Sequence, residues 1–227
     1  NNSNRNIRFA SGCGNTDYRN NVIYNWGFES TYGAESQQKG NDKFNFSNVN
    51  VVANYYKPGP ATQPGRLTTQ IAAPWSRNGD SDYGKWYITD NVMVGSTEVT
   101  NDNWKGVAPA LTAIEGVQKH NPTNYKAIPS LKLDKPWPAM AINQQTAEEA
   151  FQSVLKNAGA TLPKRDTVDA RIIKEAQDGF ATFEGPSYEK FYDVADTSKN
   201  CGIIDSPIDV GGWPVLKSGP APIDTDH

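Results

Sequence analysis

Two arginines near the start of the chain, Arg5 and Arg8, have the side chains best suited to chemistry in this sequence. A guanidinium keeps its proton up to a pKa of about 12 or above, so it acts as a base only where burial or a neighbouring cation penalises its charge. The same group can bind a carboxylate through two parallel hydrogen bonds and stabilise negative charge that develops beside it. The pair therefore fits proton abstraction from an acidic sugar polymer, with two solvated surface arginines as the alternative.

Aromatic and basic side chains in the first half of the chain could extend such a site. Tyr32 belongs to a group of tyrosines and tryptophans that could stack on sugar rings or could form the core and its rim. Lys43 and Lys57 could add positive charge to a binding groove or could be ordinary solvated lysines. For the lysines, ordinary solvation is the more common explanation.

Several other functions do not fit the composition. His120 and His227 are too few and too badly placed for a histidine metal site or a Ser-His triad. A net charge of −3 and a pI near 5.4 argue against a nucleic-acid-binding protein, because no basic face stands out. No apolar run is long enough to cross a bilayer, and no apolar signal segment follows Asn1.

Cys13 and Cys201 could form one long-loop disulfide of an exported protein or remain two buried thiols.

A repeated pattern predicts how these residues are positioned. Asn21, Asn54 and Asn91 each stand between two short runs of β-prone residues. Recurrence at this spacing, with loops of variable length, is typical of stacked coils. Asparagine tolerates the left-handed backbone conformation and can bend a strand, and stacked asparagines can hydrogen-bond along the stack. An antiparallel sandwich with asparagine-rich turns is the alternative.

The second half of the chain has a different character. Residues 101–107 are expected to be the last irregular segment of the stack, and the four prolines within residues 121–138 predict an extended stretch on the surface. Thr146 with Glu149 forms a capping-box pattern before a helix that Gly159 can end, and Asp166 and Gly179 bound a second helix. Both helices have narrow apolar faces and are expected to pack on the stack. We therefore divide the chain into coils at 1–120 and a C-terminal extension at 121–227.

Several runs of this sequence resemble the family 1 polysaccharide lyases, specifically the bacterial pectate lyases. They are residues 5–9, 16–27, 54–62 and 90–95, with further similarity at 202–206 and 210–214. The resemblance implies an all-β fold, a right-handed parallel β-helix (solenoid), here with a C-terminal extension containing short α-helices. It also implies a secreted or periplasmic enzyme that cleaves polygalacturonate, the backbone of pectin, by calcium-assisted β-elimination.

The resemblance assigns roles to individual residues. The family carries an Arg-x-Pro-x-x-Arg element whose first arginine is the catalytic base, and Arg5 occupies that position. Ile7 and Ala10 stand where the proline and the last arginine are expected, so Arg8 is expected to take over substrate binding. Tyr32, Lys43 and Lys57 are the further substrate-binding candidates.

The resemblance also predicts what lies outside the arginine element. The family's calcium-binding aspartates precede it, so the Ca²⁺ ligands are expected upstream of Asn1, in an N-terminal part that could be a separate chain. A disulfide between Cys13 and Cys201 is expected to tie the tail to the first coil. The alternative function is a non-catalytic pectin-binding β-helix protein or an inactive lyase fragment.

Overall fold

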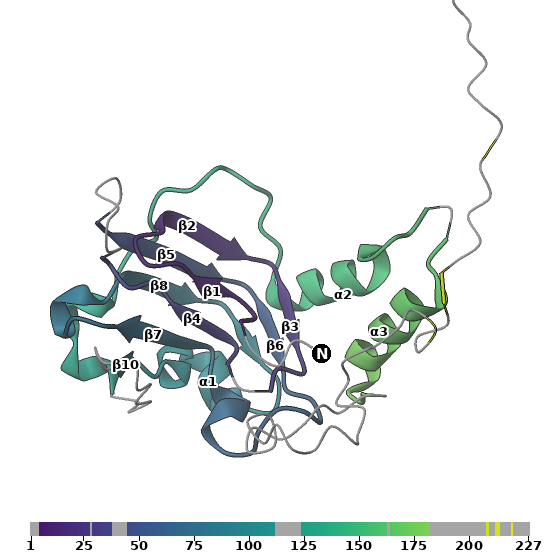
Figure 1. Cartoon of the computed structure of the whole chain (residues 1–227), viewed down its shortest axis with the longest axis horizontal. Helices are drawn as coiled ribbons and strands as arrows, with labels where there is room; N and C mark the ends of the chain where they lie inside the picture. Colours follow the sequence, from purple (N-terminus) through teal and green to yellow (C-terminus); the bar gives the residue numbers. More distant parts are fainter. Residues whose placement is uncertain are drawn as a thin grey trace, which may run out of the picture.

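The structure is a computed structural model that describes residues 5–27, 29–37, 45–111, 124–162, 164–181, 208, 212–213 and 219. Its strands form three sheets, and every pair of neighbouring strands is parallel (Figure 1). The first sheet contains β1 (Arg8–Phe9), β4 (Thr31–Gly33), β7 (Ala72–Ser76) and β10 (Ala110–Leu111). The second contains β2 (Gly14–Arg19), β5 (Ser47–Val52) and β8 (Lys85–Thr89). The third contains β3 (Val22–Tyr24), β6 (Tyr55–Lys57) and β9 (Val92–Met93).

The order of the strands repeats along the chain. Along the chain, a strand of the first sheet is followed by one of the second sheet and then one of the third, and this order repeats. Each strand pairs with its equivalent in the next coil, as Tyr18, Val51 and Ile88 do in the second sheet. This arrangement is consistent with the predicted parallel β-helix, and the antiparallel sandwich is wrong. Little of the described chain is helical.

The predicted asparagine ladder is confirmed at the turn between the second and third sheets. Nδ2 of Asn21 donates to Oδ1 of Asn54 at 3.0 Å, and Nδ2 of Asn54 donates to Oδ1 of Asn91 at 2.9 Å. Each acceptor oxygen also takes the backbone N–H of the preceding asparagine, at 2.9 Å in both cases. Asn103 adds a fourth member, because its Oδ1 accepts from Nδ2 of Asn91 at 3.0 Å. The turns of successive coils are therefore joined through side-chain amides.

The sharp bend of each turn is made by a different residue from the one predicted. The left-handed backbone belongs to the residue before each ladder asparagine, with φ of 55° at Asn20, 51° at Ala53 and 59° at Asp90. The side-chain amide of a ladder asparagine instead points along the stack, where it donates to one neighbour and accepts from the other. The prediction that the ladder asparagines themselves bend the chain is wrong.

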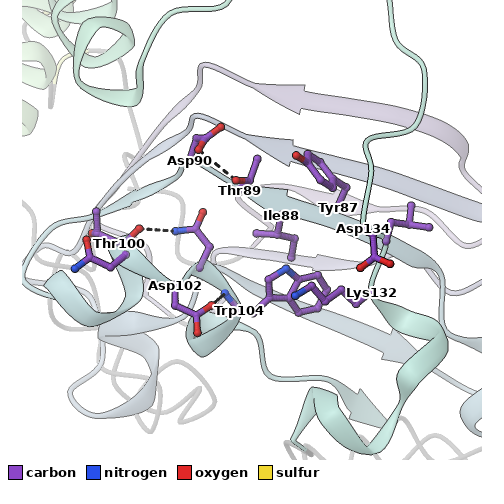
Figure 2. A pocket seen from close by; sticks show the side chains of 12 residues that line it. Tyr87, Ile88, Thr89, Asp90, Thr100, Asp102, Trp104, Lys132 and Asp134 are labelled. Atoms are coloured by element: carbon purple, nitrogen blue, oxygen red, sulfur yellow. Dashed lines mark hydrogen bonds between the residues drawn. The ribbon is translucent and has the colours of Figure 1, made fainter.

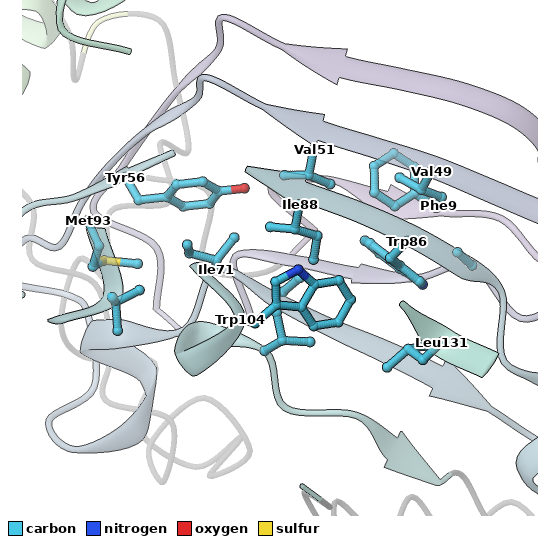
Figure 3. Close-up of a cluster of buried hydrophobic side chains, with 14 of the residues drawn as sticks. Phe9, Val49, Val51, Tyr56, Ile71, Trp86, Ile88, Met93, Trp104 and Leu131 are labelled. Carbon is cyan, nitrogen blue, oxygen red and sulfur yellow. The ribbon is translucent and has the colours of Figure 1, made fainter. Parts of the chain in front are cut away.

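Alternate side chains of the strands point into a continuous apolar core (Figure 3). Val49 and Val51 of β5 lie beside Trp86 and Ile88 of β8 in the strand register, and Phe9 packs in the same cluster, all at most 4% exposed. Phe9 contacts Trp86 edge to face, with ring centroids 5.5 Å apart. Because each coil buries its side chains against the next, a coil is stable only within the stack.

The stack is followed by short helices and an extended strap. After β9 come α1 (Thr97–Asn101) and the 3₁₀ helix η3 (Asn103–Gly106), where an irregular segment was expected. The remaining 3₁₀ helices are η1 (Arg66–Thr69), η2 (Asp80–Asp82), η4 (Tyr125–Ala127) and η5 (Pro129–Leu131), so the predicted extended stretch is partly helical. Beyond η5 the strap crosses the second sheet: Leu133 N donates to Trp86 O at 2.8 Å, and Trp137 N donates to Oδ1 of Asn50 at 2.9 Å.

Two α-helices close the described extension, α2 (Ala147–Asn157) and α3 (Thr167–Asp178). Three predicted boundaries are confirmed, since Thr146 and Glu149 form both bonds of a capping box, Asp166 caps α3, and Gly179 ends α3 with a left-handed backbone. The C-cap of α2 is Ala158, one residue before the predicted Gly159. The helices pack beside the third sheet (Figure 1), where the Phe151 ring stacks on Tyr55 at 4.3 Å. The predicted packing of the helices on the stack is thus confirmed. The domain boundary at residue 120 stays a prediction, because residues 112–123 lie outside the described ranges.

Candidate functional site

Arg5 and Arg8 lie at the first strand of the first sheet. Arg8, on β1, stands opposite Tyr32 of β4 in the strand register, and its guanidinium carbon lies 6.0 Å from the centre of the Tyr32 ring. Arg5 is exposed and has a left-handed backbone with φ of 63°. A non-glycine residue in this conformation stores strain of the kind that gathers at functional sites. The base role of Arg5 stays a prediction.

A buried carboxylate that the sequence interpretation missed lies next to Arg8. The chain leaves β4 through Gly33 and Ala34, whose φ values are 102° and 58°, and Glu35 follows. A Cβ on Gly33 would lie 2.3 Å from the Phe9 carbonyl oxygen, so glycine is required at this corner. The Glu35 side chain is 0% exposed, and its Oε1 accepts from Nη2 of Arg8 at 3.4 Å. Its other oxygen, Oε2, is buried and has no hydrogen-bond partner among the described residues.

A third charged residue, Arg77, reaches the same carboxylate from the next coil. Arg77 directly follows β7, and its Nε donates to Oε1 of Glu35 at 2.9 Å. The loop that carries it is fixed by buried Asp82, which accepts from Arg77 N at 2.8 Å and from Asn78 N at 3.2 Å. Arg8, Glu35 and Arg77 therefore form one arginine cluster across three coils, with two positive charges and one negative charge.

The other predicted substrate-binding residues have different surroundings. The Tyr32 side chain is only 3% exposed and packs against Trp75, with ring centroids 4.7 Å apart, so in this structure it supports Arg8. Nζ of Lys57 donates to the carbonyl oxygens of Ala176 and Gln177, both at 2.8 Å, and so caps the end of α3. Their roles in substrate binding stay predictions.

The remaining candidates fall partly outside the described chain. Lys43 and Cys201 are outside the described residues. Cys13 is half-buried and carries a free thiol in this structure. Because Cys201 is not described, the disulfide stays a prediction.

Glu29 is a second buried carboxylate, just before β4. Burial raises its pKa to about 7, although Nε2 of Gln70 donates to its Oε2 at 2.6 Å and Arg66 lowers the pKa. The group is 1% exposed. It therefore links the stability of this coil to pH.

A pocket of about 350 Å³ lies elsewhere, at the end of β8 beside α1, η3 and the strap (Figure 2). Its walls include the carboxylates of Asp90, Asp102 and Asp134, and one cation, Lys132, which lies 5.3 Å over the Trp104 ring. The excess of negative charge disfavours an anionic ligand. The pocket and the arginine cluster thus suit opposite charges.

The described residues offer no metal site. No three histidine, cysteine, aspartate or glutamate side chains within them come together in a way that could hold an ion. They do not fit a bound Ca²⁺, and the predicted calcium site upstream of Asn1 stays a prediction. None of the helices described here has the length and apolar character that a membrane crossing requires.

Comparison with known proteins links the chain to one kind of enzyme. No family model matches it. Over 213 residues it is 27% identical to a probable pectate lyase C of Aspergillus flavus, an alignment that covers 94% of this chain and 39% of that protein. Proteins of the same name from Aspergillus oryzae and Aspergillus fumigatus are 28% and 26% identical over 214 residues, with the same coverage. The chain therefore resembles pectate lyase-like proteins but spans only 39% of the length of these relatives.

Proposed function

We propose that this chain is part of a secreted or periplasmic pectate lyase that cleaves polygalacturonate by β-elimination, with its coils wound as a right-handed parallel β-helix. The observation that carries the proposal is the arginine cluster, whose net positive charge lies on the outer side of the first sheet. The similarity to proteins named probable pectate lyase supports the choice of an acidic pectic polymer. A right-handed coil agrees with the handedness of nearly all parallel crossover connections.

The proposed reaction needs a base and a cation at the substrate carboxylate. A base takes the proton from C5 of a uronate unit, the electron pair forms the C4–C5 double bond, and the bond from C4 to the linking oxygen breaks. The departing oxygen then takes up a proton. As the C5 proton leaves, negative charge moves onto the neighbouring carboxylate, where a guanidinium stabilises it.

We assign the base role to Arg5 and the binding of the substrate carboxylate to Arg8. Arg5 is exposed in this chain, and the proposal places substrate or further coils over it. Calcium belongs to the proposal as a cofactor with ligands outside this chain.

The assignment is tested with the full-length protein, polygalacturonate and calcium. Ultraviolet absorbance of the unsaturated product should rise with the wild type, and Arg5→Ala should abolish the rise because the base is lost. Lys105→Gln, at an exposed ion pair with Glu98, removes the same charge elsewhere and should leave the rate unchanged. An undiminished rate with Arg5→Ala would disprove the assignment of the base.

Binding without turnover is the second candidate, favoured by Ile7 and Ala10, which stand where the proline and the last arginine of the lyase element are expected. Tight association with pectin in a sedimentation assay, without any unsaturated product, would select the non-catalytic binding protein over the lyase.

A further inference from the structure

We propose that Arg77 is a second arginine that binds a uronate carboxylate, and that Glu35 is the positioning residue that holds Arg8 and Arg77 for this task. The inference rests on the proposed function, since it takes a uronic-acid polymer as the ligand. Sequence interpretation pointed only to the Arg5–Arg8 segment, and nothing in the order of residues connects Arg77 with it.

The stack brings the three side chains to one place. Arg8 is on β1, Glu35 comes two residues after β4, and Arg77 directly follows β7, and these are consecutive strands of the first sheet. The strand register puts Arg8 level with Tyr32 and Ala73, whereas Arg77 comes four residues after Ala73, so the two arginines leave the backbone at different levels of the first sheet. Both guanidinium groups return to the same oxygen of Glu35 between them.

The two guanidinium groups are partly exposed around a buried carboxylate. Arg8 and Arg77 share Glu35, whose side chain is 0% exposed, and the buried carboxylate of Asp82 accepts from the Arg77 backbone. The Arg8 side chain is 25% exposed and that of Arg77 is 51% exposed, so both guanidinium groups reach the surface. A carboxylate ligand would pair with them there, because ionic groups that are partly removed from water are favourable only when paired.

Arg77 still has unused donors. Its Nε is committed to Glu35, whereas no hydrogen bond within the described residues engages its terminal nitrogens. A guanidinium can offer two N–H groups to a carboxylate at once, which a lysine cannot do. The terminal nitrogens of Arg77 are therefore available for a second carboxylate beside Glu35.

The surroundings hold Arg77 in position before any ligand arrives. Asp82 is 0% exposed and accepts from Arg77 N, Asn78 N and, at 3.0 Å, Gln37 N. Fixing the loop in advance reduces the entropy lost on binding. Glu35 fixes the other end of the side chain through the bond to Nε.

The test measures binding of trigalacturonate and of its methyl ester to the chain by calorimetry, at low salt and with a chelator present. Arg77→Gln should weaken trigalacturonate binding about 10-fold or more, which is the usual effect of losing a charged hydrogen-bond pair. Arg77→Lys should recover only part of the loss, since charge returns without the two-pronged geometry. Binding of the ester should not change, and the exposed control Lys105→Gln should bind like the wild type.

Glu35→Gln tests the positioning role through selectivity. The variant keeps the size of the side chain and one acceptor oxygen but loses the negative charge that holds both guanidinium groups. Because these groups are then held less firmly, the preference for the free acid over the ester should fall, and the added positive charge should make binding more salt-dependent. A merely structural role would leave the preference unchanged, and thermal unfolding would show whether the variant folds.

The outcomes separate the two proposals. Trigalacturonate binding that Arg77→Gln leaves within two-fold of the wild type would overturn the inference and leave the lyase proposal intact. If the wild-type chain binds the acid no better than the ester, the choice of a uronate ligand fails, and both proposals fail with it.

Discussion

Two stacks of polar side chains cross the coils of this protein, and they differ in how completely their hydrogen-bonding groups are used. In the asparagine ladder, Asn54 accepts from Asn21 and donates to Asn91 and to the Tyr18 carbonyl oxygen. In the arginine cluster, Oε2 of Glu35 has no partner, and Arg77 uses only Nε within the described residues. Both stacks span three or more coils, but only the inner members of the ladder use their amide groups for donating and accepting.

The difference teaches what each stack is for. A buried network with every partner present fixes the register of the coils, whereas an incomplete one costs stability unless something else completes it. The ladder therefore belongs to the architecture, and the arginine cluster keeps donors for a ligand. Four measurements can break or sharpen this contrast.

The largest effect is expected for Asn54→Ala in the ladder. The change leaves the backbone N–H of Asn21 and the carbonyl oxygen of Tyr18 without their partners. Each such orphan costs about 1–3 kcal/mol, so the free energy of unfolding should fall by about 3–5 kcal/mol in chemical denaturation.

The matched control for that variant is Asn48→Ala on β5, the strand that precedes the turn of Asn54. The Asn48 side chain makes one partly buried bond, to Oδ1 of Asn15 at 3.0 Å, and its loss should cost about 1 kcal/mol. Equal losses in the two variants would contradict a special role for the ladder.

A smaller effect is expected from the buried carboxylate of Glu29. Its pKa rises from 4.5 to about 7 on folding, so between these pH values the unfolded chain has released a proton that the folded chain keeps. The free energy of unfolding should therefore decrease as pH rises through this window, by up to about 3 kcal/mol. Glu29→Gln should remove the decrease, and exposed Glu98→Gln should not. Parallel pH profiles for the wild type and Glu29→Gln would show that the carboxyl group titrates alike in both states.

Lys57→Met probes a polar contact between the stack and the extension. The variant loses the bonds from Nζ to the end of α3 but keeps an apolar chain beside Phe151. Docking of α3 should weaken by about 1 kcal/mol. Hydrogen exchange should then quicken in α3 and stay unchanged in β5. Faster exchange in both elements would mean that the helix supports the coils themselves.

The smallest stability effect is expected for Arg77→Gln. Its side chain is half exposed, and a glutamine can still donate to Glu35, so unfolding should change by less than about 1 kcal/mol. If the free energy of unfolding fell as much as it does for Asn54→Ala, the arginine cluster would be a structural network like the ladder. That result would contradict its proposed role in binding a ligand.

The same contrast explains how much the sequence revealed. The ladder could be predicted because Asn21, Asn54 and Asn91 recur 33 and 37 residues apart within similar local runs. Asn103 was missed because it follows Asn91 by only 12 residues and reaches the ladder through α1 and η3. The helices could be predicted from their caps, which are local signals.

The candidate site was less predictable for a physical reason. Glu35 and Arg77 meet Arg8 only through the strand register, after loops of unequal length, so no local pattern connects them. The corner at Gly33 was a usable signal, since a glycine directly after β-prone residues marks a change of backbone direction. Nothing comparable marks Arg77.

The hydrogen bonds of the ladder all run in the same direction along the stack, so the two ends of the ladder differ. Every Nδ2 donates toward the later coil, and the last one, on Asn103, is diverted to the carbonyl oxygens of Asn91, Val99 and Thr100. At the opposite end, Oδ1 of Asn21 accepts no hydrogen bond from any described residue. A further amide can therefore join the row only on the Asn21 side, by donating to it. The ladder ends at Asn103 and can be extended only at Asn21. A designed extra coil that carries a further ladder asparagine should therefore be added before β1.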